Sequence, residues 1–169
     1  MGFFRSPFVI QHRVAATKIK DFVLGSDVTD AEKSMSQLFQ IELHQYVFER
    51  NCLRFGLACQ TLQFYAERMP QQEIGSAKGF FHRLMNEYRE NLRQMNATEA
   101  ADSMEEAISI YQIQETPPVP AIAANFVKRL TNDRLGPQDF DTLPQFLDLV
   151  DNYVKTTIDL VKDNLSKLK

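Results

Sequence analysis

The chain has 169 residues, of which 44% are hydrophobic and 24% charged, and its formal net charge is -3. This composition is typical of a soluble globular domain, and it excludes a disordered chain, a collagen-like repeat and a low-complexity segment. The negative charge also argues against nucleic-acid binding, because neutralising phosphates requires a basic surface. We therefore predict one domain covering residues 1–169 and no nucleic-acid partner.

The first predicted element is a helix over residues 7–24, where apolar residues recur at helical spacing. Ser6 can cap this helix, and Pro7 suits its first turn because the missing amide of proline is not needed there. Gly25 can end it in a left-handed conformation.

The second predicted helix begins at a capping box, in which Thr29 and Glu32 satisfy backbone amides of the first turn. No strong helix breaker follows before Pro70 except Gly56. A single helix over residues 30–69 would be about 60 Å long, which exceeds the width of a domain of this size. The pattern leaves open whether this segment forms one protruding helix or two helices.

This second segment carries two apolar stripes on different faces, whereas a surface helix needs only one. One stripe consists of Leu38, Ile41, His44, Phe48, Cys52, Phe55, Cys59, Leu62, Ala66 and Met69. The other, interrupted by Arg50, consists of Phe39, Leu43, Tyr46, Leu53, Leu57 and Phe64. Either the segment is a central helix wrapped by the others, or the second stripe is the interface with a protein partner or with a second copy in a homodimer.

His44 falls on the first stripe, and we expect it to point into a core. A buried histidine with a hydrogen-bond partner serves a structural role. The alternative is that His44 is the internal polar group of a small-ligand or haem-binding helical bundle, since one helical histidine suffices as a haem ligand.

Later segments complete the helical pattern, with predicted helices over 76–96, from Thr98 to the Pro-rich connector 116–120, from Pro120 to Gly136, and from a cap at residue 141 or 142 onward. None shows the alternation of a strand. We predict an all-α, single-domain antiparallel helical bundle of five to six helices with one long central helix. The connector 116–120 is the only candidate hinge.

Charge differs between two neighbouring helices. Residues 97–116 contain acidic but no basic side chains, whereas the helix over 76–96 is rich in arginine and lysine. The pattern predicts a helical hairpin with complementary faces, and it leaves open an acidic surface that docks a basic partner.

Cys52 and Cys59 lie too far apart on one helix to form a disulfide. Two free thiols on an apolar stripe suit a reducing compartment, so we predict a cytoplasmic protein. No apolar run is long enough to span a bilayer, so we expect no stable membrane insertion. A third reading is a lipid-anchored peripheral membrane protein, because Gly2 and Ser6 match the N-myristoylation pattern.

Motifs for catalysis, metal binding and phosphate binding are absent from the sequence. We therefore predict no cofactor and no metal. The function that we predict is a non-catalytic protein–protein interaction module, acting as an adaptor, chaperone or regulatory subunit through apolar helix faces.

Overall fold

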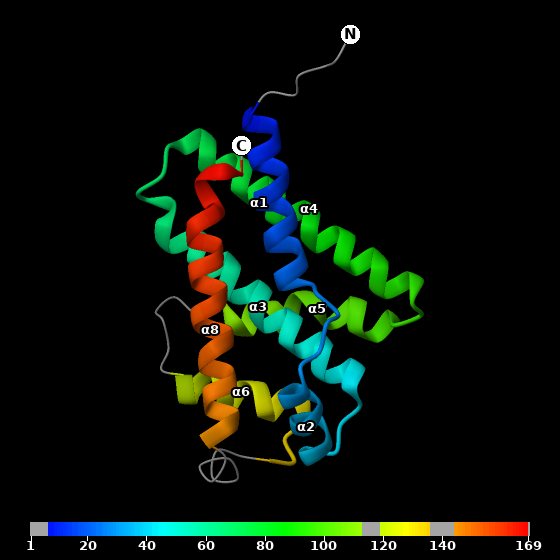
Figure 1. The fold of residues 1–169 in the computed structure, drawn as a ribbon. Coiled ribbons are helices and arrows are strands. Elements are labelled where there is room, and N and C mark those ends of the chain that lie inside the picture. Colours follow the sequence, from blue (N-terminus) through cyan, green and yellow to red (C-terminus); the bar gives the residue numbers. More distant parts are fainter. Residues whose placement is uncertain (1–6, 113–118, 136–143, 169) are drawn as a thin grey trace.

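The computed structural model describes residues 7–112, 119–135 and 144–168, which form seven α-helices, one 3-10 helix and no strand. These elements are α1 (Pro7–Val23), α2 (Asp30–Leu38), α3 (Leu43–Ala66), α4 (Gln71–Gln94), α5 (Thr98–Tyr111), α6 (Val119–Leu130), α8 (Pro144–Asn164) and the 3-10 helix η1 (Leu165–Lys167). The predicted all-α class is therefore confirmed (Figure 1). Gly2 and most of the candidate hinge at 116–120 lie outside the described residues.

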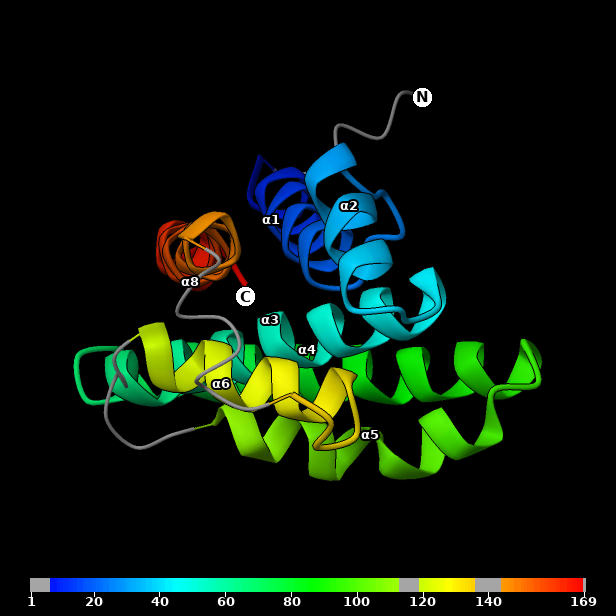
Figure 2. The same ribbon diagram turned by 90° about the horizontal axis from the view of Figure 1, so that it is seen from below.

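The helices form crossed layers rather than a bundle with nearly parallel axes. α1 and α8 pack together and run in opposite directions, whereas α3, α4, α5 and α6 run across them (Figure 1). In Figure 2, α1, α2 and α8 lie on one side of α3, whereas α5 lies on its opposite side. The helix count differs from the predicted five to six because residues 30–69 form two helices, α2 and α3.

A turn at residues 39–42 separates α2 from α3. Gln40 has a left-handed backbone with φ 54°. The amide of Ile41 donates to the carbonyl of Ser36, and the amide of Gln40 donates to the carbonyl of Gln37. This pair of bonds is a Schellman motif, which normally places Gly or Asn in the left-handed position. Because glutamine occupies that position, the sequence contained no recognisable helix stop.

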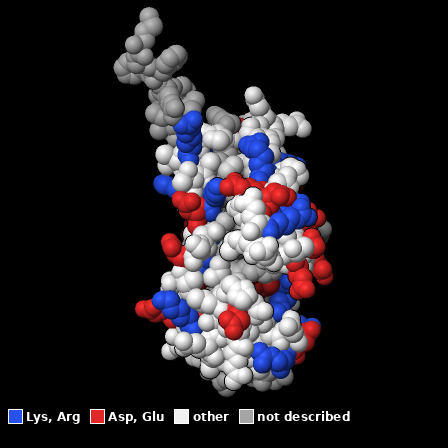
Figure 3. Space-filling view, turned by 90° about the vertical axis from the view of Figure 1, so that its right-hand side faces the viewer, with Lys and Arg blue, Asp and Glu red and all other residues white. Residues whose placement is uncertain are grey.

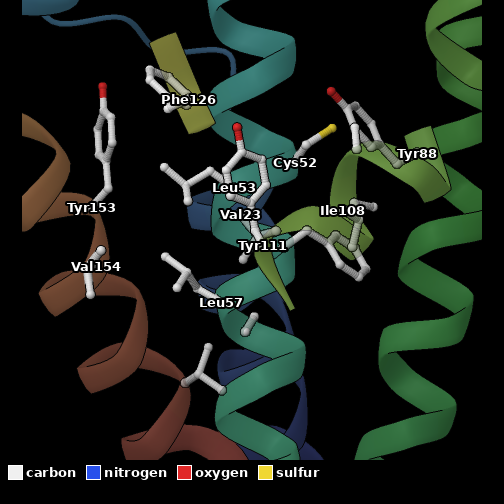
Figure 4. Packing of buried hydrophobic residues seen from close by; sticks show 14 of the residues in the cluster. Val23, Cys52, Leu53, Leu57, Tyr88, Ile108, Tyr111, Phe126, Tyr153 and Val154 are labelled. Atoms are coloured by element: carbon white, nitrogen blue, oxygen red, sulfur yellow. The ribbon is translucent and has the colours of Figure 1, made fainter. Parts of the chain in front are cut away.

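α3 is the central helix, and it is shorter than predicted. It has 24 residues, which corresponds to about 36 Å. It packs against α1, α2, α4, α5, α6 and α8. Figure 4 shows Leu53 and Leu57 facing side chains of α8, while Cys52 lies toward Tyr88 and Ile108. Within α3, residues of both apolar stripes are thus buried against the surrounding helices, as the central-helix interpretation expected.

Gly56 marks the closest approach of two helices rather than a kink in α3. A Cβ atom at this position would lie 2.6 Å from Cβ of Tyr111 and 2.7 Å from the carbonyl oxygen of Ile108. Since carbonyl oxygens belong to the backbone of α5, a side chain could not be accommodated by a simple rotamer change. Glycine therefore sets the distance between α3 and α5.

We expect Gly56→Ala to lower the free energy of unfolding by about 1–3 kcal/mol, because the added methyl group overpacks the α3–α5 contact. Gly75→Ala is the matched control, since nothing lies within 4 Å of a Cβ at this helical position. That control should raise stability by about 0.5–1 kcal/mol through the better helix propensity of alanine. Urea unfolding of both variants measures the two effects, and a stabilised Gly56→Ala protein would contradict the close approach.

A buried ion pair joins α2 to α3. The side chains of Arg50 and Glu32 are 1% and 2% exposed, and Nη1 of Arg50 lies 3.0 Å from Oε1 of Glu32. The same Nη1 donates to the carbonyl of Asp27 at 2.8 Å. Tyr153 of α8 donates to Oε1 of Glu32 at 2.6 Å, and the amide of Thr29 donates to Oε2 at 2.8 Å. The predicted capping box is thus present and is part of a larger network.

The charge state of Glu32 depends on this network. Burial raises the pKa of Glu32, but the hydrogen bonds from Tyr153, from the Thr29 amide and from Arg50 together bring the pKa below its ordinary value of 4.5. A carboxyl group whose pKa is lower in the folded state stabilises the fold above its unfolded pKa. This stabilisation is lost as the pH falls through the folded pKa.

We expect Glu32→Gln to lower the free energy of unfolding by about 3–5 kcal/mol at neutral pH, because it leaves the buried guanidinium of Arg50 without a counter-charge. Glutamine keeps the capping acceptor, but its NH2 group then faces Arg50 and Tyr153, so the loss includes an acceptor as well as the charge. The difference from the wild type should shrink as the pH falls below about 4.5. Urea unfolding across pH 3–7 tests this, with the exposed Glu106→Gln as control, expected to stay within about 0.5 kcal/mol. A difference that stays constant with pH would contradict the assignment.

Candidate functional site

A groove of about 690 Å³ lies between the N-terminal part of α3, the turn from α4 to α5, and the end of α6. Its lining residues are His44, Gln45, Phe48, Glu49, Asn96, Ala97, Thr98, Glu99, Ala100, Ser103, Arg129, Leu130 and Asn132. Most of these carry polar or charged groups. The volume is in the range of about 300–1,000 Å³ that is typical of ligand sites.

Glu49 is the most buried charged side chain of the groove, with 6% of its side chain exposed. The hydroxyl of Tyr111 donates to Oε1 of Glu49 at 2.5 Å, and Nε of Arg129 donates to the same oxygen at 2.6 Å. No donor among the described residues reaches Oε2. Within this part of the chain, Nε of Arg54 is the only fully buried side-chain nitrogen or oxygen without a partner, so Oε2 of Glu49 retains accessible surface.

The local environment of Glu49 shifts the pKa of its carboxyl group. Burial raises its pKa, and the hydrogen bond from Tyr111 and the charge of Arg129 offset only part of this effect, so the net shift is upward. Arg129 is 26% exposed. Its two terminal nitrogens have no hydrogen-bond partner among the described residues. The groove therefore offers one strong acceptor and several donors to an incoming molecule.

Two left-handed turns place the edges of the groove. Asn96 ends α4 with φ 58°, and Asn132 follows α6 with φ 49°. Both turns have the pair of backbone bonds seen in the turn after α2. The bond of the pair that spans more residues joins the amide of Ala97 to the carbonyl of Leu92 in the first turn, and the amide of Asp133 to the carbonyl of Lys128 in the second. Asparagine tolerates this backbone well. Helix ends, rather than helix faces, thus form two sides of the groove.

α4 and α5 form the helical hairpin predicted from their opposite charges. Arg89 pairs with Glu105, and Nη2 of Arg93 lies 3.6 Å from Oδ1 of Asp102. Figure 3 shows acidic and basic side chains interspersed on the side of the molecule where this hairpin lies. The acidic residues of α5 thus lie partly beside arginines of the same chain.

The residues predicted for an interaction surface mostly lie in the core. The exposed fractions are 3% for Phe39, 0% for Tyr46, 0% for Leu53 and 1% for Leu57. Leu43 is half-buried. A partner cannot reach the four core residues without unfolding the chain. Their burial has a direct cause: Phe39 packs on Phe146 of α8, and Tyr46 packs on Phe126 of α6.

Phe64 is the one predicted interaction residue that is well exposed, with an exposed fraction of 63%. It lies near the C-terminal end of α3, where its ring contacts Tyr65 and the guanidinium of Arg68. Phe64 is not a lining residue of the groove.

His44 does not point into a core, so this prediction is wrong. It is exposed and lines the groove. The predicted stripe ran across residues 39–42, where the helix is interrupted, so the spacing between Leu38 and His44 carried no information on orientation. In the part of the chain that the structure describes, no group of three or more His, Cys, Asp or Glu side chains is arranged to hold a metal ion.

Cys52 and Cys59 are both free thiols. Burial raises the pKa of Cys52 well above its ordinary value and raises that of Cys59 to about 11, so neither is an activated nucleophile. None of the described helices combines the length and apolar character needed to cross a membrane.

Comparisons with known proteins give no match: no family model fits this chain, and neither the curated proteins nor the solved structures include a similar one. The candidate site therefore stands on the geometry of the groove.

We expect Glu49→Gln to have a pH dependence opposite to that of Glu32→Gln. Because the pKa of Glu49 is raised in the folded state, the folded protein binds more protons at this carboxyl group than the unfolded chain does at pH values between the unfolded and the folded pKa. The stability that wild type has relative to Glu49→Gln should therefore fall as the pH rises from about 4.5 through the folded pKa, and then level off. Urea unfolding over the same pH series measures this difference, again with Glu106→Gln as control. A difference that grows with pH would contradict the raised pKa.

Proposed function

We propose that this protein is a non-catalytic protein–protein interaction module, and that a segment of a partner protein occupies the groove between α3, the α4–α5 turn and α6. The observation that carries the proposal is the open Oε2 of Glu49, a nearly buried acceptor without a donor among the described residues. Because Oε2 keeps accessible surface within the groove, an N–H group of a bound segment can donate to it.

The proposed contact surface is the groove and not the helix face that the sequence indicated. Self-association or a partner on the second stripe was expected if the segment formed one helix of about 60 Å, because such a helix would protrude and expose this stripe. α3 does not do so: Tyr46, Leu53 and Leu57 are covered within the chain. A partner in the groove needs none of these residues, so we propose a different protein rather than a second copy.

Support for a non-catalytic role comes from the arrangement of the groove. Covalent catalysis needs a nucleophile within hydrogen-bond reach of a base. His44, Thr98 and Ser103 all line the groove. Among the described residues, His44 has no side-chain hydrogen bond to either hydroxyl. Glu49, the buried carboxyl group of the groove, accepts hydrogen bonds from Tyr111 and Arg129 and none from these three residues.

A small polar ligand is the second candidate, because His44 lies in the groove, together with amide and hydroxyl groups. Haem is not proposed, since the charged side chains of Glu49 and Arg129 lie where its apolar ring would need apolar contacts.

A photo-crosslinking experiment tests the proposal. The benzophenone amino acid p-benzoylphenylalanine replaces Gln45 in the groove or, as matched control, Gln63, which is exposed on the same helix outside it. We expect a protein from the native host to be captured from position 45 and not from position 63. The captured protein, purified, should bind wild type and lose at least about tenfold in affinity to Arg129→Gln, which removes a charged donor of the groove.

Equal capture from both positions, or binding that Arg129→Gln leaves unchanged, would contradict the groove as the contact site. A small molecule that co-purifies with the wild type, and is lost from Arg129→Gln in native mass spectrometry, would favour the second candidate instead.

A further inference from the structure

The groove is lined by both hydrogen-bond donors and acceptors. Three carboxamide side chains line it, one from each of its three sides: Gln45, Asn96 and Asn132. All three residues are exposed, and none of their side-chain amides bonds to another described residue. Each carboxamide offers both a carbonyl acceptor and an N–H donor, and a peptide group offers the same pair.

Most of the charge in the groove is paired within the chain. Glu49 and Arg129 form an ion pair, and the lining also includes the carboxylate of Glu99. An anionic ligand would meet the two carboxylates and the negative C-terminal ends of α4 and α6. A cationic ligand would meet Arg129 and the positive N-terminal ends of α3 and α5. A neutral ligand that both donates and accepts hydrogen bonds fits this balance better than a charged one.

On these grounds we infer that the groove recognises the backbone of an extended, uncharged peptide segment, and this inference rests on the proposed interaction function. Oε2 of Glu49 accepts a backbone N–H, the terminal nitrogens of Arg129 donate to a backbone carbonyl, and the carboxamides pair with peptide groups along the segment. The lining also includes Phe48 and Leu130. Because side chains alternate along an extended chain, every second one faces these apolar residues.

Backbone recognition predicts which chemical changes in the peptide lower its affinity most. Bonds to main-chain groups are independent of the side chains, so many neutral sequences should bind with similar affinity. Removing one backbone N–H by N-methylation should weaken binding more than removing any charged side chain. Recognition of a charged side chain would give the reverse order.

The experiment uses a phage-displayed library of random dodecapeptides selected on the 169-residue chain. The strongest binder is then synthesised with both ends capped. N-methylation at one or more positions should raise Kd by about tenfold, since it removes a donor to a carboxylate. Alanine at any charged position should change Kd by less than about threefold. Isothermal titration calorimetry gives both sets of values.

Variants of the protein locate the bound peptide. Gln45→Ala, Asn96→Gly and Asn132→Gly each remove one carboxamide, and glycine keeps the left-handed backbone at residues 96 and 132. Each variant should raise the Kd of the peptide by about fivefold, as expected for the loss of a neutral hydrogen bond. Gln63→Ala, on the same helix as Gln45, is the matched control and should bind like wild type. Circular dichroism confirms that each variant is folded.

The outcomes separate this inference from the proposed function. A peptide whose affinity depends chiefly on one charged side chain, or which binds the three variants and wild type equally, overturns backbone recognition. If crosslinking captures a partner from position 45 but the library gives no binder, backbone recognition is overturned and the interaction function stands. If neither gives a binder, both are overturned.

Discussion

The buried guanidinium of Arg50 connects the loop before α2, α2 itself and, through Glu32, α8 to the central helix. It lies on the central helix, and its Nη1 donates both to Glu32 of α2 and to the carbonyl of Asp27 in the loop before α2. Its Nη2 donates to the carbonyl of Gly25 in the same loop. Tyr153 brings α8 to the same carboxylate. An unpaired charge at this depth would be strongly unfavourable, so the loop, α2 and α8 must all be in place for α3 to be buried.

How far the sequence predicts this fold depends on whether the determining signal is local. The capping box of Thr29 and Glu32 is local, and it was found correctly. The break at Gln40 was missed because a left-handed glutamine has no sequence signature, although the two backbone bonds of the motif form there as they do elsewhere. Without that signal the division of residues 30–69 stayed open in the prediction, and the orientation of His44 was predicted wrongly.

The candidate site was harder to predict than the helices. Glu49 acquires its character from Tyr111 and Arg129, which lie 62 and 80 residues away in the chain. The sequence did contain a weak signal for the buried ion pair, since Arg50 interrupts an apolar stripe and a charge on a buried face requires a counter-charge. No comparable signal marked the groove, because it is formed by helix ends whose positions depend on the tertiary fold.

The hairpin of α4 and α5 gives the groove a dependence on ionic strength. One edge of the groove is the tip of this hairpin, and Met95 beside it is 76% exposed. Close to that tip, the two helices are joined by ion pairs whose side chains are partly open to water, Arg93 with Asp102 and Arg89 with Glu105. Such pairs are screened once the Debye length falls to a few ångströms, as it does near 1 M salt. The amide protons at the tip should then exchange with solvent faster than those of α3, so that one wall of the groove opens by local unfolding while the core of the molecule stays closed.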